Sequence, residues 1–234
     1  MLIEIWSDVV CPWCYIGKRR LEEALTSFEH ADEVDVVFRS FELDPTAPQV
    51  GTESVAEALG RKYGGGVDAV RPMMDRVAVI AAEVGLEFDY EHATHTKTVD
   101  AHRLLHEALA QGGPALQREL KERLLAAYFL RGRSMGDHEV LREVAVGAGL
   151  DAVRVDAVLA GDEHVGAVRA DIDQARAYGA TGVPFFVVDR RYGVSGAQPT
   201  GVFSELLQRA WDDSHPGLQM LADGTVCGPD GCAV

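Results

Sequence analysis

The chain has 234 residues, of which 47% are hydrophobic, and its formal net charge at pH 7 is −15. This length and composition are sufficient for a globular core, and the strong negative charge argues against nucleic acid and anionic membrane surfaces as partners. No apolar run approaches the roughly 18 residues that would cross a membrane. The apolar stretch at the N-terminus contains Glu4 and Asp8 and has no basic region before it. We therefore expect no signal peptide and a cytoplasmic protein.

The N-terminal part of the sequence predicts a strand, a helix and a second strand. The apolar run 2–6 is followed by Cys-Pro-Trp-Cys at 11–14 and then by apolar residues at helical spacing up to Glu29. Residues 34–41 alternate between apolar and polar types, and prolines follow them, which is typical of a strand. This gives a β-α-β unit whose helix begins at a pair of cysteines.

The middle of the chain, residues 51–178, shows an almost wholly helical pattern. Helices are expected to begin near Thr52, Val70, Asp100, Leu116, Asp137, Asp151 and Asp162. We place Pro72 in the first turn of its helix, and we expect Gly112 and Gly113 to separate two helices. The apolar stripes along these helices are interpreted as core and not as a binding surface.

Strand signals return after Gly179. Residues 183–188 and 192–196 flank a polar turn, which predicts a hairpin, and a final helix includes 202–211. We therefore predict one α/β domain that takes sheet strands from both ends of the chain and is split by a helical insertion of about 51–178.

The four cysteines form two close pairs, which point to redox or metal chemistry in a cytoplasmic protein. Cys11 stands at the predicted helix start, where free backbone N–H groups and the helix dipole favour thiolate over thiol. Pro12 fits the first helical position. Cys14, one turn later, lies on the same face and can attack a mixed disulfide formed at Cys11. We expect Cys11 to be the more reachable thiol, with a pKa below about 8.5.

Two segments resemble one family. Asp-Val-Val-Cys-Pro-Trp-Cys-Tyr-Ile-Gly at 8–17 and Thr-Gly-Val-Pro-Phe-Phe at 181–186 resemble the DsbA-like thioredoxin-fold oxidoreductases, most of all the cytoplasmic FrnE-type group. The resemblance covers nearly the whole chain. It implies a thioredoxin-like fold with a large all-helical insertion, in which 1–50 and 179–234 form the thioredoxin-like domain and 51–178 the inserted helical domain.

The resemblance also implies an activity. It points to a thiol–disulfide oxidoreductase or isomerase that acts on protein or peptide disulfides, with a small thiol or a thioredoxin-type protein as candidate reductant. We expect no metal or organic cofactor. Cys11 is the candidate attacking thiol and Cys14 the candidate resolving thiol. The family pattern further implies a cis bond between Val183 and Pro184, which would present the substrate beside Cys11; on the residues alone, a trans proline starting an edge strand is equally open.

Other side chains near the motif are further candidates for the site. Pro12 and Trp13 are candidate substrate-binding residues, and Trp13 either packs inside or faces an apolar peptide. Asp8 is either a solvated charge at a strand end or an acid/base group for the second cysteine. His102 lies in a segment that faces the active site in the family, but Lys-Thr at 97–98 departs from the usual Asn-Thr. We therefore interpret His102 as a satisfied histidine on a helix face.

The second pair of cysteines lies in the tail. Cys227 and Cys232 flank the turn sequence Pro-Asp-Gly, which can fold the chain back and bring two sulfurs together. FrnE-type proteins often have such a pair, which implies an auxiliary redox pair. The alternative is an inert tail that closes by adventitious oxidation.

Two other functions stay open. Kappa-type glutathione transferases and hydroxychromene-carboxylate isomerases share the split thioredoxin architecture, but they typically present a serine where Cys11 stands. A zinc-stabilised binding module would pool all four thiols in one site. A pair that opens a helix behind proline is a poor zinc knuckle, so we expect no metal.

Overall fold

The computed structural model describes residues 1–216, 227–228 and 231–232. The strands are β1 (Leu2–Ser7), β2 (Asp35–Ser40), β3 (Phe185–Val188), β4 (Tyr192–Ser195), β5 (Cys227–Gly228) and β6 (Gly231–Cys232). The helices are α1 (Pro12–Thr26), α2 (Val55–Tyr63), α3 (Gly66–Ala82), α4 (Val99–Phe129), α5 (His138–Ala148), α6 (Ala152–Ala160), α7 (Val165–Ala177) and α8 (Thr200–Ser214). Among these helices none is long and apolar enough to cross a membrane.

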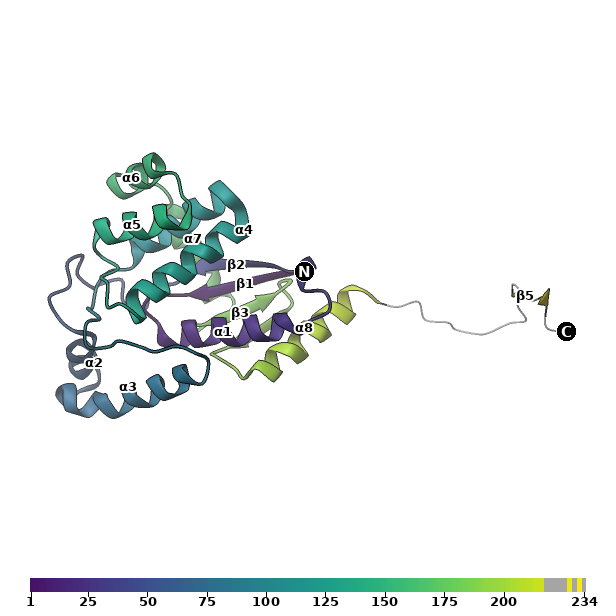
Figure 1. The fold of residues 1–234 in the computed structure, drawn as a ribbon, viewed down its shortest axis with the longest axis horizontal. Helices are drawn as coiled ribbons and strands as arrows, with labels where there is room; N and C mark the ends of the chain where they lie inside the picture. Colours follow the sequence, from purple (N-terminus) through teal and green to yellow (C-terminus); the bar gives the residue numbers. More distant parts are fainter. Residues whose placement is uncertain (217–226, 229–230, 233–234) are drawn as a thin grey trace.

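The main sheet joins strands from both ends of the chain (Figure 1). Its order is β2-β1-β3-β4, with β1 parallel to β2 and antiparallel to β3, and the β3–β4 hairpin closes one side. Ile3 lies opposite Val36 on one neighbour and opposite Val188 on the other. The chain therefore forms the predicted mixed α/β fold, with β1 in the interior of the sheet.

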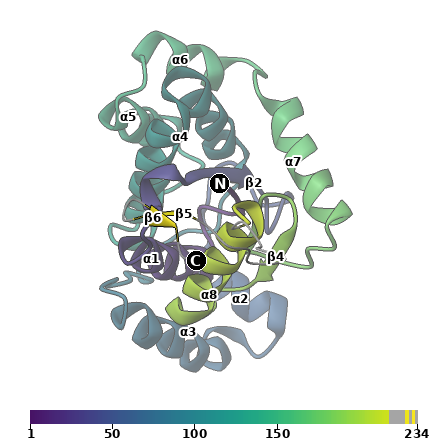
Figure 2. The ribbon, with the colours of Figure 1, turned by 90° about the vertical axis from the view of Figure 1, so that its right-hand side faces the viewer.

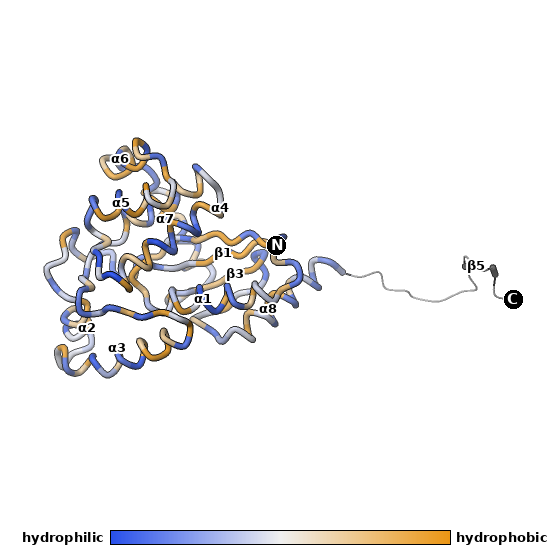
Figure 3. Tube along the Cα trace, in the orientation of Figure 1, coloured by the Kyte–Doolittle hydropathy of each residue, from blue (hydrophilic) through white to orange (hydrophobic). Residues whose placement is uncertain are grey.

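Side chains along β1 point alternately to the two faces of the sheet, and each set packs against different helices. Ile3 and Ile5 pack in an apolar cluster with residues of α1 and α8, whereas Trp6 packs with Ala175 of α7 and Val187 on the other face. Figure 2 shows α7 apart from α1 and α8, and Figure 3 shows hydrophobic residues concentrated in β1 and β3. The sheet is therefore buried on both sides, as its nearly continuous apolar strands require.

Helix α4 packs along the free edge of β2. The Gln117 side chain accepts the Phe38 N–H at 2.9 Å and donates to the Phe38 carbonyl at 2.9 Å, so it satisfies backbone groups of an edge strand that has no further strand beside it in the described part of the chain. The largest apolar cluster lies among the helices that follow β2 and precede β3 in the chain, and it includes Val9 from the turn after β1 and Tyr15 and Ile16 from the start of α1. The helical segment thus packs directly against the cysteine motif. The division of the chain into two domains stays a prediction.

Several local predictions are confirmed. The hairpin forms as β3 and β4. Gly112 and Gly113 break the helical backbone within α4, where Gly113 has φ of 66°, a region that favours glycine. Asp137 and Asp151 cap α5 and α6 through backbone N–H groups of the first turn.

Other helix starts were predicted wrongly. Ser54, and not Thr52, caps α2, because Ser54 forms a reciprocal capping box with Glu57. Helix α3 begins before the expected position, so Pro72 lies inside the helix and not in its first turn. Asp162 precedes α7 without capping it. These errors concern loop geometry that the apolar periodicity does not encode.

Candidate active site

The Cys-Pro-Trp-Cys motif forms the start of α1, directly after β1. Cys11 has extended backbone angles, φ −94° and ψ 115°, and is the N-cap residue, while Pro12 is the first helical residue. The Cys14 N–H donates to the Cys11 carbonyl at 3.1 Å, which closes the first turn. Both cysteines therefore lie at the helix end whose free N–H groups favour negative charge, as the sequence indicated.

The two cysteines are almost equally buried. Cys11 is 3% exposed and Cys14 is 2% exposed. The expectation that Cys11 is the more reachable residue is therefore not met in this structure. Trp13, in contrast, is 37% exposed. Its indole faces outward and is not packed in the core, which leaves it available to an apolar partner.

The loop before β3 lies against Cys11. The Cys11 thiol donates to the Val183 carbonyl, with 3.6 Å between Sγ and the oxygen. The Val183–Pro184 bond is cis, as predicted. Gly17 permits this approach, because a Cβ on Gly17 would lie 3.2 Å from Pro184 Cγ and 3.2 Å from Phe186 Cζ. The structure thus brings together Cys11, Cys14, Val183 and Pro184.

The two neighbouring thiols shift each other's pKa in opposite directions. The hydrogen bond to Cys14, followed by burial, raises the pKa of Cys11 well above its usual value. Burial opposes ionisation of Cys14 too, but the hydrogen bond from Cys11, the Lys121 cation and the Ser7 hydroxyl together lower the pKa of Cys14. The expected low pKa of Cys11 is therefore wrong for this resting state. The contacts in this structure therefore favour ionisation of Cys14 relative to that of Cys11.

Asp8 is not a solvated charge, so that interpretation is wrong. It is 1% exposed, and it accepts the Val9 N–H at 2.7 Å and the Leu43 N–H at 2.8 Å. His102 Nε2 lies 3.2 Å from Asp8 Oδ1. Burial works against the charged form, but the hydrogen bond and charge of His102, with the Leu43 N–H and Lys121, hold the pKa of Asp8 below 3.8.

His102 is buried, and only one of its two ring nitrogens has a hydrogen-bond partner among the described residues. It is fully covered, its Nε2 meets Asp8, and its Nδ1 has no hydrogen-bond partner among the described residues. The interpretation of His102 as a satisfied histidine on a helix face is therefore wrong. The His102 ring belongs to a polar group beneath the cysteine motif, because the segment 98–102 packs against the turn that holds Asp8.

Lys121 is a site residue that the sequence analysis missed. It is fully buried in α4, its Nζ donates to the Ser7 carbonyl at 3.3 Å, and it lies over the Phe38 ring at 5.4 Å from the centroid. Burial lowers the pKa of Lys121 to about 8, although Cys14, Asp8 and Cys11 oppose this effect. No local pattern in the sequence distinguishes Lys121 from a lysine that reaches solvent.

The comparisons with known proteins decide the family. The sequence profile described as "DSBA-like thioredoxin domain" matches residues 2–208, which is most of the chain. The chain belongs to the DsbA-like thioredoxin domain family. An uncharacterized Bacillus subtilis protein, YwbO, is 26% identical over 210 residues, covering 88% of this chain and 94% of that protein.

Solved structures agree with this DsbA-like assignment. A Streptomyces coelicolor protein described as a probable DsbA oxidoreductase is 47% identical, with a TM-score of 0.85, and the match covers 100% of this chain and 99% of that one. The cytosolic disulfide reductase DsbM from Pseudomonas aeruginosa, solved with GSH, shares the fold at 17% identity, a TM-score of 0.63 and coverage of 92% and 98%. A 2-hydroxychromene-2-carboxylate isomerase also shares the fold, at 11% identity and a TM-score of 0.66. The match covers 92% of this chain and 98% of that one.

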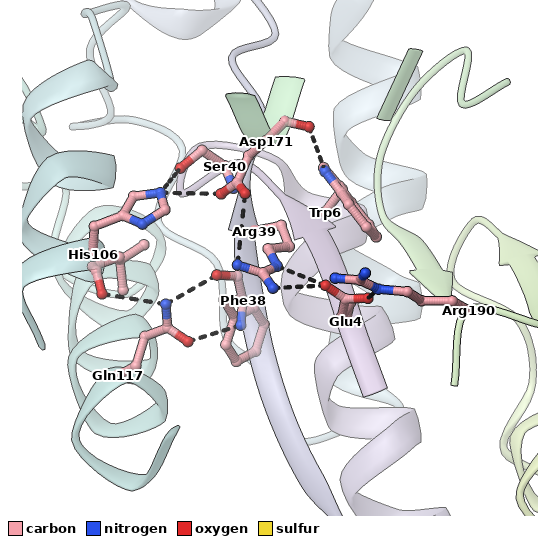
Figure 4. Close-up of polar contacts among 10 residues, drawn as sticks. Glu4, Trp6, Phe38, Arg39, Ser40, His106, Gln117, Asp171 and Arg190 are labelled. Carbon is pink, nitrogen blue, oxygen red and sulfur yellow. Dashed lines mark hydrogen bonds and ion pairs between the residues drawn. The ribbon is translucent and has the colours of Figure 1, made fainter. Parts of the chain in front are cut away.

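A second polar cluster of this DsbA-like chain lies under α7 (Figure 4) and comprises Glu4, Trp6, Arg39, Ser40, His106, Asp171 and Arg190. Asp171 accepts the Ser40 N–H at 2.8 Å, and its carbonyl accepts the Trp6 indole N–H at 2.7 Å. His106 Nε2 lies 3.1 Å from Ser40 Oγ and 3.0 Å from Asp171 Oδ2. A serine–histidine–aspartate relay needs both ring nitrogens. Here one nitrogen meets both partners, so the cluster anchors α7 to the sheet.

Three possible metal ligands lie away from the cysteines. Glu107, Glu163 and His164 bring ligand atoms within 4.8 Å of one another. The Arg154 guanidinium already occupies this group, at 3.0 Å from Glu107 and 2.6 Å from Glu163. We therefore interpret these residues as an ion-pair cluster that joins α4, α6 and the start of α7.

The predicted auxiliary cysteines lie outside the part of the chain whose side chains are described. The backbone of β5 pairs with that of β6, and Cys227 lies opposite Cys232. Their roles stay predictions.

Proposed function

We propose that the chain is a thiol–disulfide oxidoreductase that acts on protein or peptide disulfides through Cys11 and Cys14. The observation that carries this proposal is the position of the dithiol at the N-terminus of α1, with Cys11 Sγ 3.6 Å from the Val183 carbonyl beside Pro184. An extended peptide that pairs with the Val183 backbone would bring its own disulfide to Cys11.

The reaction follows from the two sulfurs. The Cys11 thiolate attacks one sulfur of the substrate disulfide, forms a mixed disulfide and releases the first substrate thiolate. The Cys14 thiolate then attacks Cys11 Sγ, which forms the Cys11–Cys14 disulfide and releases the second substrate thiolate. Two electrons pass from the dithiol to the substrate. Cys11 attacks as the thiolate, so a Cys11 thiol must lose its proton before the first step.

Isomerase activity, a cytoplasmic location and the FrnE-type assignment are the finer parts of the proposal. An isomerase needs a mixed disulfide that lasts long enough to rearrange, and the buried Cys14 is suited to control that lifetime. DsbM, which has the same fold, is described as a cytosolic disulfide reductase.

We propose Cys227 and Cys232 as an auxiliary redox pair. Facing residues of an antiparallel ladder have Cα atoms about 4.5–5.5 Å apart, which is within the disulfide range.

An insulin-reduction assay and refolding of a protein with scrambled disulfides test this function. We expect the purified chain to accelerate insulin reduction, alone or together with the refolding reaction. A small thiol or a thioredoxin-type protein would serve as the electron donor. The matched control is the Cys11→Ser/Cys14→Ser double variant. Equal rates for the two proteins would overturn the proposal, and so would one equivalent of zinc bound by the thiols of protein purified without added metal. Glutathione transfer to an electrophile without disulfide reduction would favour the transferase alternative.

A further inference from the structure

The face of the sheet that α7 covers carries an apolar cluster that extends to the cis-proline loop. Its buried members are Trp6, Ala175 and Val187. The half-buried apolar side chains that pack against them are Phe41, Ala180, Val183 and Phe185. We call these seven residues, together with Tyr178, the α7-face cluster. Val183 thus takes part in two features, because its carbonyl meets Cys11 and its side chain belongs to this cluster.

Trp6 is the fixed centre of the α7-face cluster. Its indole N–H donates to the Asp171 carbonyl at 2.7 Å, and its side chain is 1% exposed. The Tyr178 ring stands edge-on to the indole, with 5.5 Å between the ring centroids, and the Phe185 ring is tilted against it at 6.2 Å. Tyr178 directly follows α7 and is 36% exposed. Solvent therefore reaches an aromatic rim at the start of the loop that leads to Pro184.

The charged groups beside this cluster are already paired. Glu4 lies 2.7 Å from Arg39 and 3.2 Å from Arg190, and Asp171 lies 3.0 Å from His106 (Figure 4). A charged side chain from a bound molecule would lose hydration without finding a free opposite charge among these groups. An apolar side chain would bury apolar area instead. The α7-face cluster therefore favours an apolar group as its ligand.

The backbone of Val183 determines where a substrate side chain would lie. An extended peptide that pairs with Val183 in the antiparallel sense places one of its residues directly opposite Val183. Two opposed residues point to the same face of a sheet, with their Cβ atoms about 4.5–5.5 Å apart. Since the Val183 side chain packs on the α7-face cluster, the opposed side chain of the peptide also lies on that face. It does not lie over α1 and α8, which cover the other face.

We infer that the α7-face cluster is a subsite that binds one large apolar side chain of the substrate close to its reacting cysteine. This inference rests on the proposed function and names its substrate class. Cys11 Sγ lies 3.6 Å from the Val183 carbonyl, which is about the 3.3 Å rise of one residue in a strand. The apolar residue and the reacting cysteine are therefore at most two positions apart. Tyr178 is the exposed member that this side chain contacts.

Peptide disulfides with one varied position test the subsite. Each probe is a peptide of serine and glycine with a single cysteine, joined by a disulfide to glutathione. One of the two positions before or after the cysteine carries Phe, Leu, Ser, Lys or Asp. At one of these positions we expect Phe and Leu to react about tenfold faster than Ser in a single turnover of the reduced protein, the factor that about half of the burial energy of such a side chain gives. Lys and Asp should have no advantage over Ser.

Substitutions on the two faces of the sheet locate the subsite. Tyr178→Ser should lower the preference for Phe over Ser from about tenfold to about twofold, because less apolar area is buried, and Tyr178→Phe should keep it. Tyr178→Glu should shift the preference toward Lys, a change that a loss of stability does not produce. Phe41→Ala should act in the same direction as Tyr178→Ser, and thermal melts identify the variants that fold. Val202→Ser is the matched control, because Val202 is 38% exposed but lies in α8. It should keep the preference.

The outcomes separate the two proposals. If the reduced protein reacts with all probes at the same rate, the assignment of the subsite is wrong and the proposed function stands. The assignment is also wrong if the folded Tyr178 and Phe41 variants keep the full preference, or if Val202→Ser lowers it as much as Tyr178→Ser does. If the reduced protein reacts with no probe and with no protein disulfide, the proposed function fails, and the inference about the subsite fails with it.

Discussion

Cys11 Sγ lies 3.6 Å from the Val183 carbonyl oxygen, although 172 positions separate the two residues in the chain. This contact joins the start of α1 to the loop before β3. A peptide that pairs with the Val183 backbone would compete with Cys11 for this carbonyl. Substrate binding and activation of Cys11 are thereby linked through one carbonyl group.

The two cysteines should respond differently to substitution. Cys11→Ser is expected to abolish reduction of insulin disulfides, because no thiol remains beside Val183. Cys14→Ser should leave the first attack possible and accumulate mixed disulfides, since the second step lacks its nucleophile. Non-reducing gels and mass spectrometry of the trapped species measure this. Modification of Cys14 alone by an alkylating agent at neutral pH would show that the order of the two thiols is the reverse.

Gly17 tests the fit between α1 and the cis-proline loop. In Gly17→Val the added side chain must displace Pro184 or Phe186, which lie 3.2 Å from the position of a Cβ. We expect a loss of about 1–3 kcal/mol in the free energy of unfolding, and a lower rate of disulfide reduction because Val183 moves away from Cys11. Gly166→Val in α7 is the control, since a Cβ there meets no atom within 4 Å. Equal effects of the two variants would contradict this interpretation.

Asp8 should make stability depend on pH in acid. The pKa of Asp8 in the folded chain lies below 3.8, so its contribution is fully present above about pH 4 and is lost as the pH falls through the folded value. Asp8→Asn should therefore cost about 1–3 kcal/mol at pH 7. That difference from the wild type should shrink steadily below about pH 4. Urea unfolding from pH 2 to 7 measures it, with the exposed Asp173→Asn as control. A constant difference across this range would contradict the assignment.

The strands, the hairpin and most helices follow from local signals in the sequence. The position of the cysteine pair at a helix start could be predicted from an apolar run, a proline and helical spacing, all within residues 2–29. The break in the helical backbone at 112–113 could be predicted from the two glycines alone. The juxtaposition of Cys11 and Val183 was predictable only through the resemblance to a family, because no local pattern relates the two segments.

The polar group under the cysteines was not predictable in this way. His102 and Asp8 are 94 positions apart, and Lys121 and Ser7 are 114 positions apart. Each pair meets only because α4 packs beside β2 and reaches the end of β1 and the turn that follows it. The opposite pKa shifts of Cys11 and Cys14 depend on burial and on groups such as Lys121, which no local sequence pattern places beside the motif. A lysine next to an apolar helical stripe is normally expected to reach solvent, and burial makes Lys121 an exception.

Removal of the tail tests the role of the second cysteine pair. Deletion of the residues after Ala222 should leave the melting temperature nearly unchanged, because the sheet and helices of residues 1–216 contain the apolar clusters. A disulfide between Cys227 and Cys232 closes a small loop, for which chain entropy contributes on the order of 2 kcal/mol. Such a bond is labile and suited to exchange with Cys11 and Cys14. We therefore expect the deletion to change turnover, or the balance between reduction and isomerisation.

Cys227→Ser/Cys232→Ser in the full chain should reproduce the change, since it removes only the thiols. Identical kinetics of wild type and deletion variant in every thiol assay would show that the tail pair has no part in catalysis.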